Sequence, residues 1–108
     1  MAKKITYSVP QAQLALFAKA LSHPARVYIL EVLSNKSCCF SGDMAEEVPI
    51  ARSTLSQHLK ELKYAGLIQG NIEPPQIKYC INRKNWNIAK KMLSCFLKDN
   101  PNINNESC

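Results

Sequence analysis

The sequence predicts a mainly helical domain that carries one β-hairpin, an α+β fold. Apolar residues recur at helical spacing in several segments between residues 10 and 98, and two β-rich runs flank a proline-containing turn. The chain has 108 residues, which is enough for one small domain and too few for two ordinary ones. Prolines, glycines and capping residues then divide the chain into its predicted elements.

Prolines mark the starts of the first two predicted helices. Pro10 fits the first turn of a helix that has a broad apolar face. Pro24 starts a second, mostly buried helix that ends near residues 34–35. Asp43 is a capping residue at the start of a short third helix, which Pro49 ends.

The segment Arg52–Ala65 predicts a fourth helix with two different faces. Leu55, Leu59 and Leu62 form an apolar stripe that faces the core, and Gly66 stops the helix as the residue after its cap. The opposite face is rich in short side chains that can form hydrogen bonds, in place of the Glu and Lys of an ordinary solvated face. These residues are Ser53, Ser56, Gln57 and Lys60.

Only residues 49–51 separate the third helix from the fourth, a spacing that matches a helix-turn-helix. The β-rich runs 67–72 and 77–81 predict a β-hairpin that directly follows it. A hairpin in this position is the wing of a winged helix-turn-helix. Gln76 and Lys78 lie where a wing touches the DNA backbone or minor groove, although an edge hairpin with an ordinary lysine explains each of them equally well.

The bulk composition favours an anionic partner. A formal net charge of +6 and a pI near 9.2 are typical of a nucleic-acid-binding domain, although basic domains also bind anionic membranes or acidic proteins. The sequence predicts no membrane span and no signal peptide, so we expect a cytoplasmic protein whose five cysteines are mostly reduced. No P-loop, G-x-S-x-G, H-E-x-x-H or dinucleotide-binding turn is present, so we predict that it is not an enzyme.

The last predicted helix, residues 82–98, carries two apolar stripes, more than a small core needs. The first helix has the same surplus, so we predict a homodimer in which the first and last helices pack across a two-fold axis. We expect residues 1–9 to form a flexible arm, residues 10–98 to form the winged helix-turn-helix and dimerisation domain, and the asparagine-rich residues 99–108 to be a disordered tail.

Residues 21–30, residues 53–68 and the hairpin that follows resemble the ArsR/SmtB family of small bacterial winged-helix repressors. Proteins of this family are homodimers that bind inverted-repeat operators in double-stranded DNA. They commonly leave DNA when a metal ion, a metalloid or a reactive sulfur species binds. The resemblance implies that the DNA-reading segment contains Ser53, Thr54, Ser56, Gln57 and His58.

Helical geometry agrees with the resemblance on Ser53, Ser56 and Gln57. We expect Ser56 and Gln57 to read bases, whereas His58 lies beside the apolar stripe, so a scaffold role suits it at least as well as a base contact. His23, before Pro24, is also better explained as an interhelix scaffold residue than as a metal ligand. The residues expected to hold phosphates are Arg52, Thr54, Lys60 and Lys78.

Metal-sensing members of the family often carry Cys-x-Cys shortly before an acidic residue. If Asp43 marks that acidic position, Cys39 fills one cysteine position and Ser41 stands at the other, while Cys38 is an additional neighbour. The family's other common site uses Asp and His on the last helix. Residues 83–98 contain neither, which argues against a typical zinc sensor.

Three interpretations of Cys38 and Cys39 remain open. They chelate As(III) or another thiophilic ion together with a third thiolate from Cys80, Cys95 or Cys108; or one of them pairs oxidatively with Cys95; or both are small buried residues without a ligand. No other cofactor is expected.

The sequence therefore predicts a repressor released by a thiol-reactive effector. A repressor that responds to redox or reactive sulfur, and a winged-helix protein that binds DNA without an effector, are the alternatives within the same class. A protein-interaction module built on the apolar first and last helices is the alternative from another class.

Overall fold

The protein structure, a computed structural model, describes residues 6–36 and 39–98. Within these ranges the predicted α+β fold is confirmed. The helices are α1 (Val9–Ala20), α2 (Pro24–Ser34), α3 (Arg52–Tyr64) and α4 (Arg83–Phe96), and a single 3-10 turn, η1 (Met44–Glu46), precedes α3. The strands are β1 (Phe40–Ser41), β2 (Ile68–Asn71) and β3 (Lys78–Ile81).

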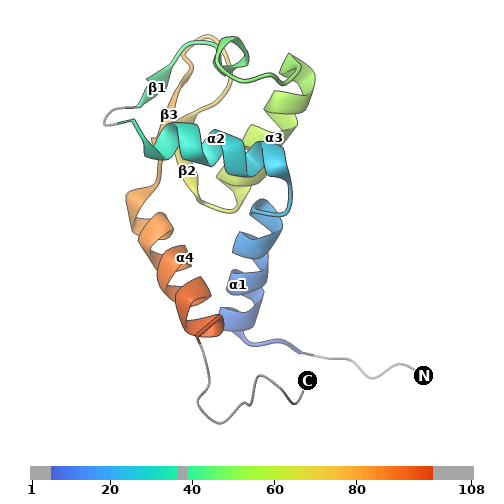
Figure 1. The fold of residues 1–108 in the computed structure, drawn as a ribbon, viewed down its shortest axis with the longest axis vertical. Helices are drawn as coiled ribbons and strands as arrows, with labels where there is room; N and C mark the ends of the chain where they lie inside the picture. The colour runs from blue at the N-terminus through green and yellow to red at the C-terminus, as the bar shows by residue number, and fades with distance from the viewer. Residues whose placement is uncertain (1–5, 37–38, 99–108) are drawn as a thin grey trace, which may run out of the picture.

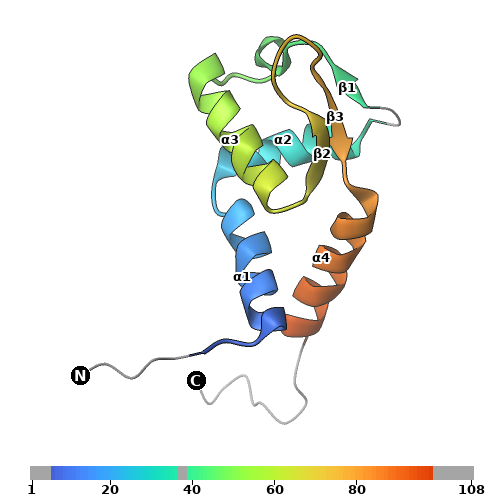
Figure 2. The same cartoon turned by 180° about the vertical axis from the view of Figure 1, so that it is seen from behind.

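The described elements fall into two groups at opposite ends of the molecule (Figures 1 and 2). Helices α1 and α4 lie side by side at one end, and α2, α3 and the sheet form the other. The sheet is antiparallel in the order β1-β3-β2, with Phe40 opposite Tyr79 and Ile68 opposite Ile81. All four of these side chains are buried, and α2 and α3 pack against this side of the sheet. The sheet therefore holds β2 and β3, the predicted wing, next to α3.

Local capping interactions start α1, α2 and α4 within one residue of the predicted positions. Ser8 and Gln11 form a reciprocal capping box at α1. Pro24 is the first residue of α2, and the His23 side chain caps that helix. Asn82 caps α4 in the same way. These starts are set by neighbouring residues, which explains why the sequence is sufficient to locate them.

Helix α3 ends as predicted at Gly66, whose φ of 83° is in the left-handed region. The amide of Gly66 donates to the carbonyl of Lys63, and the amide of Leu67 donates to the carbonyl of Leu62. This pair of hydrogen bonds is the Schellman motif. The side chain of Asn85 on α4 donates to the Gly66 carbonyl at 2.9 Å, so the end of α3 is also joined to the first turn of α4.

Two elements differ from the prediction. The expected third helix is the single turn η1, although Asp43 caps it as expected through a hydrogen bond to the Ala45 amide. Pro49 disfavours helical backbone at Val48, which leaves too few residues for a full α-helix. Strand β1 was not predicted, because two residues carry no periodicity and this strand exists only through its pairing with β3.

The predicted arm and tail fall largely outside the described residues, which begin at residue 6 and end at residue 98. The helix after the predicted arm starts at Val9, one residue earlier than expected. No helix in the described part of the chain is long and apolar enough to cross a membrane.

Candidate nucleic-acid interface and thiol pair

Helix α3 divides its residues between the core and solvent as the sequence predicts. Leu55, Leu59 and Leu62 are buried, and Ser56 is half-buried. The exposed residues of its outer face are Ser53, Thr54, Gln57 and Lys60. These side chains offer hydroxyl, amide and ammonium groups on one helical surface. Such groups can form hydrogen bonds with base edges and phosphates.

The first residue of α3 is held by an ion pair with the residue that caps η1. Arg52 Nε donates to Asp43 Oδ2 at 2.7 Å, and the Arg52 Nη2 group also contacts this oxygen. Asp43 accepts hydrogen bonds from Arg52 and from the Ala45 amide, and these bonds lower the pKa of Asp43. Ala51 precedes α3 and offers it no side-chain cap. The Arg52 side chain is still 76% exposed, so it is accessible to a phosphate only as a partner shared with Asp43.

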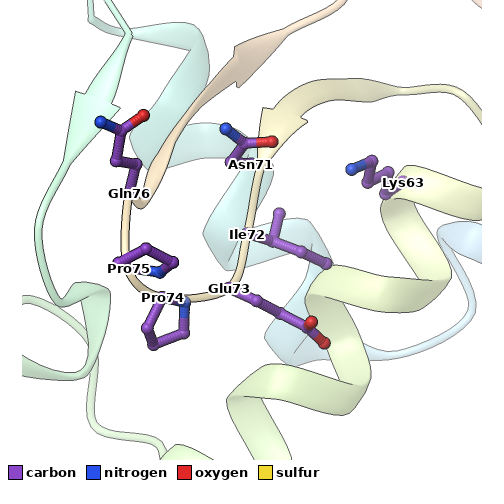
Figure 3. Close-up of a pocket in the computed structure, with 7 residues that line it drawn as sticks. All are labelled: Lys63, Asn71, Ile72, Glu73, Pro74, Pro75 and Gln76. Carbon is purple, nitrogen blue, oxygen red and sulfur yellow. The ribbon is translucent and has the colours of Figure 1, made fainter.

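The wing lies next to α3 and contacts it through its loop. Lys60 Nζ lies 3.6 Å from the Glu73 carboxylate, which links the outer face of α3 to the loop between β2 and β3. Figure 3 shows the cleft beside this contact, with the Glu73 and Ile72 side chains extending toward α3. The other residues that line the cleft are Lys63, Asn71, Pro74, Pro75 and Gln76. Gln76 and Lys78 are exposed on the wing.

His58 has a different environment from its neighbours on α3. It is buried, its Nδ1 accepts a hydrogen bond from Arg26 Nε at 3.2 Å, and its ring centre lies 4.4 Å from that of His23. Arg26 also donates to the Lys19 carbonyl at the end of α1. His58 therefore joins α3 to α1 and α2. Its burial favours the scaffold role over the base contact that the family resemblance implies.

We expect the free energy of unfolding to decrease as the pH is lowered below about 6.5, partly because of His58. Burial, followed by the charges of His23 and Arg26, lowers the pKa of His58. The unfolded chain then binds this proton more readily than the folded protein, so acid favours unfolding. The test compares free energies of unfolding at pH 7.5 and pH 5.5 for the native protein and His58→Gln. The variant should show the smaller pH dependence, and equal dependence in both would contradict this role.

The structure brings together two of the predicted candidate cysteines. The Sγ atoms of Cys39 and Cys80 are 2.7 Å apart, and Gln69 Nε2 lies 3.9 Å from the Cys80 sulfur. Cys95 is exposed on the last turn of α4, which Figure 1 shows at the opposite end of the molecule from β1. A pairing of Cys39 with Cys95 is therefore not formed within one protomer. Cys38 and Cys108 lie outside the described residues.

The described residues contain no cluster of three or more His, Cys, Asp or Glu side chains suited to a metal ion.

Sequence patterns do not identify Arg26 as a functional residue, since its partners His58 and Lys19 are 32 and 7 residues away. Contacts at such separations leave no periodic signal in the sequence.

Comparisons with known proteins agree with this geometry. Residues 23–69 match the family described as bacterial regulatory protein, arsR family. The HTH-type transcriptional regulator YgaV of Escherichia coli is 33% identical over 72 residues, which are 67% of this chain and 73% of YgaV. The HTH-type transcriptional regulator CmtR of Mycobacterium tuberculosis is 31% identical over 77 residues, or 71% of this chain. The match spans 64% of the length of CmtR.

A solved structure shares the fold as well. The crystal structure of M. tuberculosis Rv0081 has a TM-score of 0.54 and 29% identity, with 84% of this chain and 95% of that chain covered. The matched family and these named relatives are transcriptional regulators and not enzymes. By sequence and by fold, the chain belongs to the ArsR family of bacterial regulatory proteins.

Proposed function

We propose that this regulator is a cytoplasmic, dimeric repressor that binds an inverted-repeat operator. Each protomer would place α3 in a major groove with the wing of β2 and β3 beside it. The observation that carries this proposal is the exposed polar face of α3 next to that wing. Two-fold symmetry then gives half-sites roughly one helical turn of DNA apart, about 10 bp.

The proposed roles follow from exposure and chemistry. Ser56 and Gln57, in the middle of the polar face, would read bases, and Ser53 would support them from the first turn. Lysines on α3 and β3, together with a hydroxyl group, would hold phosphates and set the register on DNA. These residues are Thr54, Lys60 and Lys78, with Arg52 shared between Asp43 and the backbone and Gln76 available on the wing.

Exposed apolar side chains on α1 and α4 support the dimer. Phe96 and Leu97 are 70% and 71% exposed at the end of α4, and Val9 is 79% exposed at the start of α1. These two helices lie together at the end of the molecule away from the wing (Figure 2). An exposed apolar surface of this kind is typical of an interface, and its burial in a two-fold contact would leave both α3 helices accessible.

Gln57→Ala should relax sequence preference. A bidentate amide contact to a base contributes about 1–3 kcal/mol of discrimination, and a dimer would lose two such contacts, so the operator should bind at least about 30-fold more weakly. Binding to random DNA should be unchanged, because Gln57 would contribute no phosphate contact. Fluorescence anisotropy with both DNAs measures the two affinities. Equal losses on operator and random DNA would contradict the base-reading role.

Lys60→Ala should reduce the salt dependence of DNA binding. Removing one lysine from a phosphate lowers the slope of log K against log salt by about 0.9, which gives a change of about 2 for a dimer. Lys91→Ala is the matched control, since Lys91 is exposed on α4 at the other end of the molecule. An unchanged slope for Lys60→Ala would remove this lysine from the phosphate contacts.

We also propose that a thiol-reactive effector, As(III) or another thiophilic ion, releases the repressor by binding at Cys38 and Cys39. The short distance between Cys39 and Cys80 supports Cys80 as the additional thiolate. Release requires that the effector bind the DNA-free conformation of the repressor more tightly than the DNA-bound conformation. Anisotropy on the promoter of its own operon, with As(III) or with a persulfide donor, separates chelation from sulfur chemistry. Binding that neither reagent disturbs would identify a repressor without this effector.

A further inference from the structure

We propose that Cys39 and Cys80 are a site of oxidative modification, at which hydrogen peroxide or a related two-electron oxidant forms a disulfide across the sheet. The bond would link the residue before β1 to a central residue of β3. This inference goes beyond release by a chelated ion and needs no third thiolate.

The strand register places the two cysteines directly opposite each other. Phe40 pairs with Tyr79 and Ser41 pairs with Lys78 in the antiparallel β1–β3 ladder, so the next pair along is Cys39 and Cys80. Opposed residues in such a ladder have Cα atoms about 4.5–5.5 Å apart. A disulfide needs Cα atoms about 4.4–6.8 Å apart. The backbone is therefore already spaced for the bond, and only the side chains must rotate.

Both sulfurs lie on the side of the sheet that small reagents can reach. Side chains alternate along a strand, so the burial of Phe40 and Tyr79 in the core directs Cys39 and Cys80 to the opposite face. Each cysteine is half-buried there, and Gln69 of β2 is the polar neighbour of Cys80 on this face. This partial exposure leaves both sulfurs accessible to hydrogen peroxide and to a small dithiol reductant.

The reaction balances with one equivalent of peroxide. The thiolate of one cysteine attacks a peroxide oxygen and breaks the O–O bond, which yields a sulfenic acid and, after protonation of the leaving hydroxide, water. The second thiolate then attacks this sulfur, the S–S bond forms, and the sulfenic hydroxyl leaves as a second water. Two thiols lose two electrons and two protons in total. A dithiol reductant reverses the change by exchange.

The bond would close a covalent ring around one half of the molecule. Residues 39–80 contain β1, η1, α3 and β2, together with most of β3, whereas α1, α2 and α4 lie outside the ring. A ring of this length removes much of the freedom of the unfolded chain. The oxidised protein should therefore melt on the order of 10 °C higher than the reduced protein.

The test treats the full-length protein with one equivalent of hydrogen peroxide, then maps linked peptides by mass spectrometry without reductant and measures Tm with and without dithiothreitol. We expect a Cys39–Cys80 linked peptide and a reversible rise in Tm. Cys95→Ser and Cys38→Ser should give the same linked peptide and the same rise in Tm as the native protein, because neither residue is in the bond. Cys39→Ser and Cys80→Ser should show neither the peptide nor the rise, while each reduced variant melts cooperatively.

Three results would overturn the inference: a peptide that links Cys38 to Cys80, a disulfide between protomers through Cys95, or no intramolecular link at all. Any change in DNA affinity on oxidation rests on the proposed function, but the peptide map and the Tm do not. A reduced protein that fails to bind DNA would therefore count against the repressor alone.

Discussion

Leu62→Ala is expected to lower the free energy of unfolding by about 2–5 kcal/mol. Leu62 is fully buried on α3 and belongs to the core cluster formed by the helices and the sheet. Truncation removes apolar burial and leaves a cavity that rigid neighbours fill only in part. Urea denaturation followed by circular dichroism measures the loss. Protein concentration must be held constant, because apparent stability would depend on it in the proposed dimer.

Tyr64→Ala is the matched control on the same helix. Tyr64 is two residues from Leu62 but is 78% exposed, so its truncation should change the free energy of unfolding by less than about 0.5 kcal/mol. The contrast isolates core packing from helix propensity. Similar losses for Leu62→Ala and Tyr64→Ala would mean that the buried face of α3 is assigned incorrectly.

Gly70→Ala should distort the wing. Gly70 has a φ of 110°, and a Cβ there would lie 2.9 Å from the Cα of Tyr79 and even closer to the carbonyl oxygen of Lys78. Backbone atoms of a paired strand cannot yield as a flexible side chain would. The substitution therefore adds a steric cost to the backbone strain of about 1–3 kcal/mol for a side chain at this φ. Displacement of the wing should also weaken operator binding.

Gly42 provides the control for the backbone term. Its φ is also 110°, but among the described residues, apart from its own chain neighbours, no atom lies within 4 Å of the position that a Cβ would take. Gly42→Ala should therefore show the backbone cost alone, and Gly70→Ala should exceed it by about 1–3 kcal/mol in unfolding experiments. Equal losses for the two variants would show that the close approach to β3 is relieved without cost.

Elements that depend on neighbouring residues could be located from the sequence. Pro24 at the start of α2, Asn82 before α4 and Gly66 after α3 act within one or two turns, so their positions can be inferred from a single chain. The buried and exposed faces of α3 follow equally well from helical periodicity. For the same reason, the polar part of the candidate interface was predictable.

The parts that could not be predicted depend on contacts between distant residues. Strand β1 forms because β3 offers it a partner, and Cys39 meets Cys80 across 41 residues of chain. His58 shows the same limit, because its position beside the apolar stripe left two roles open. Its contact with Arg26, which favours the scaffold role, is visible only in three dimensions.

The hydrogen bonds between α4 and the end of α3 have a mechanical consequence. Asn85 holds the carbonyl of Gly66, and the adjacent amide of Asn82 holds the carbonyl of Leu67 at 2.9 Å. The two hydrogen bonds thereby join α3 and α4 at a fixed angle, with the junction at residues 66–67. A tilt of α4 must swing α3 through a corresponding arc, unless these two hydrogen bonds break. In the proposed dimer, the angle between α3 and α4 at this junction would set the distance between the two α3 helices, and so the operator spacing that such a dimer would tolerate.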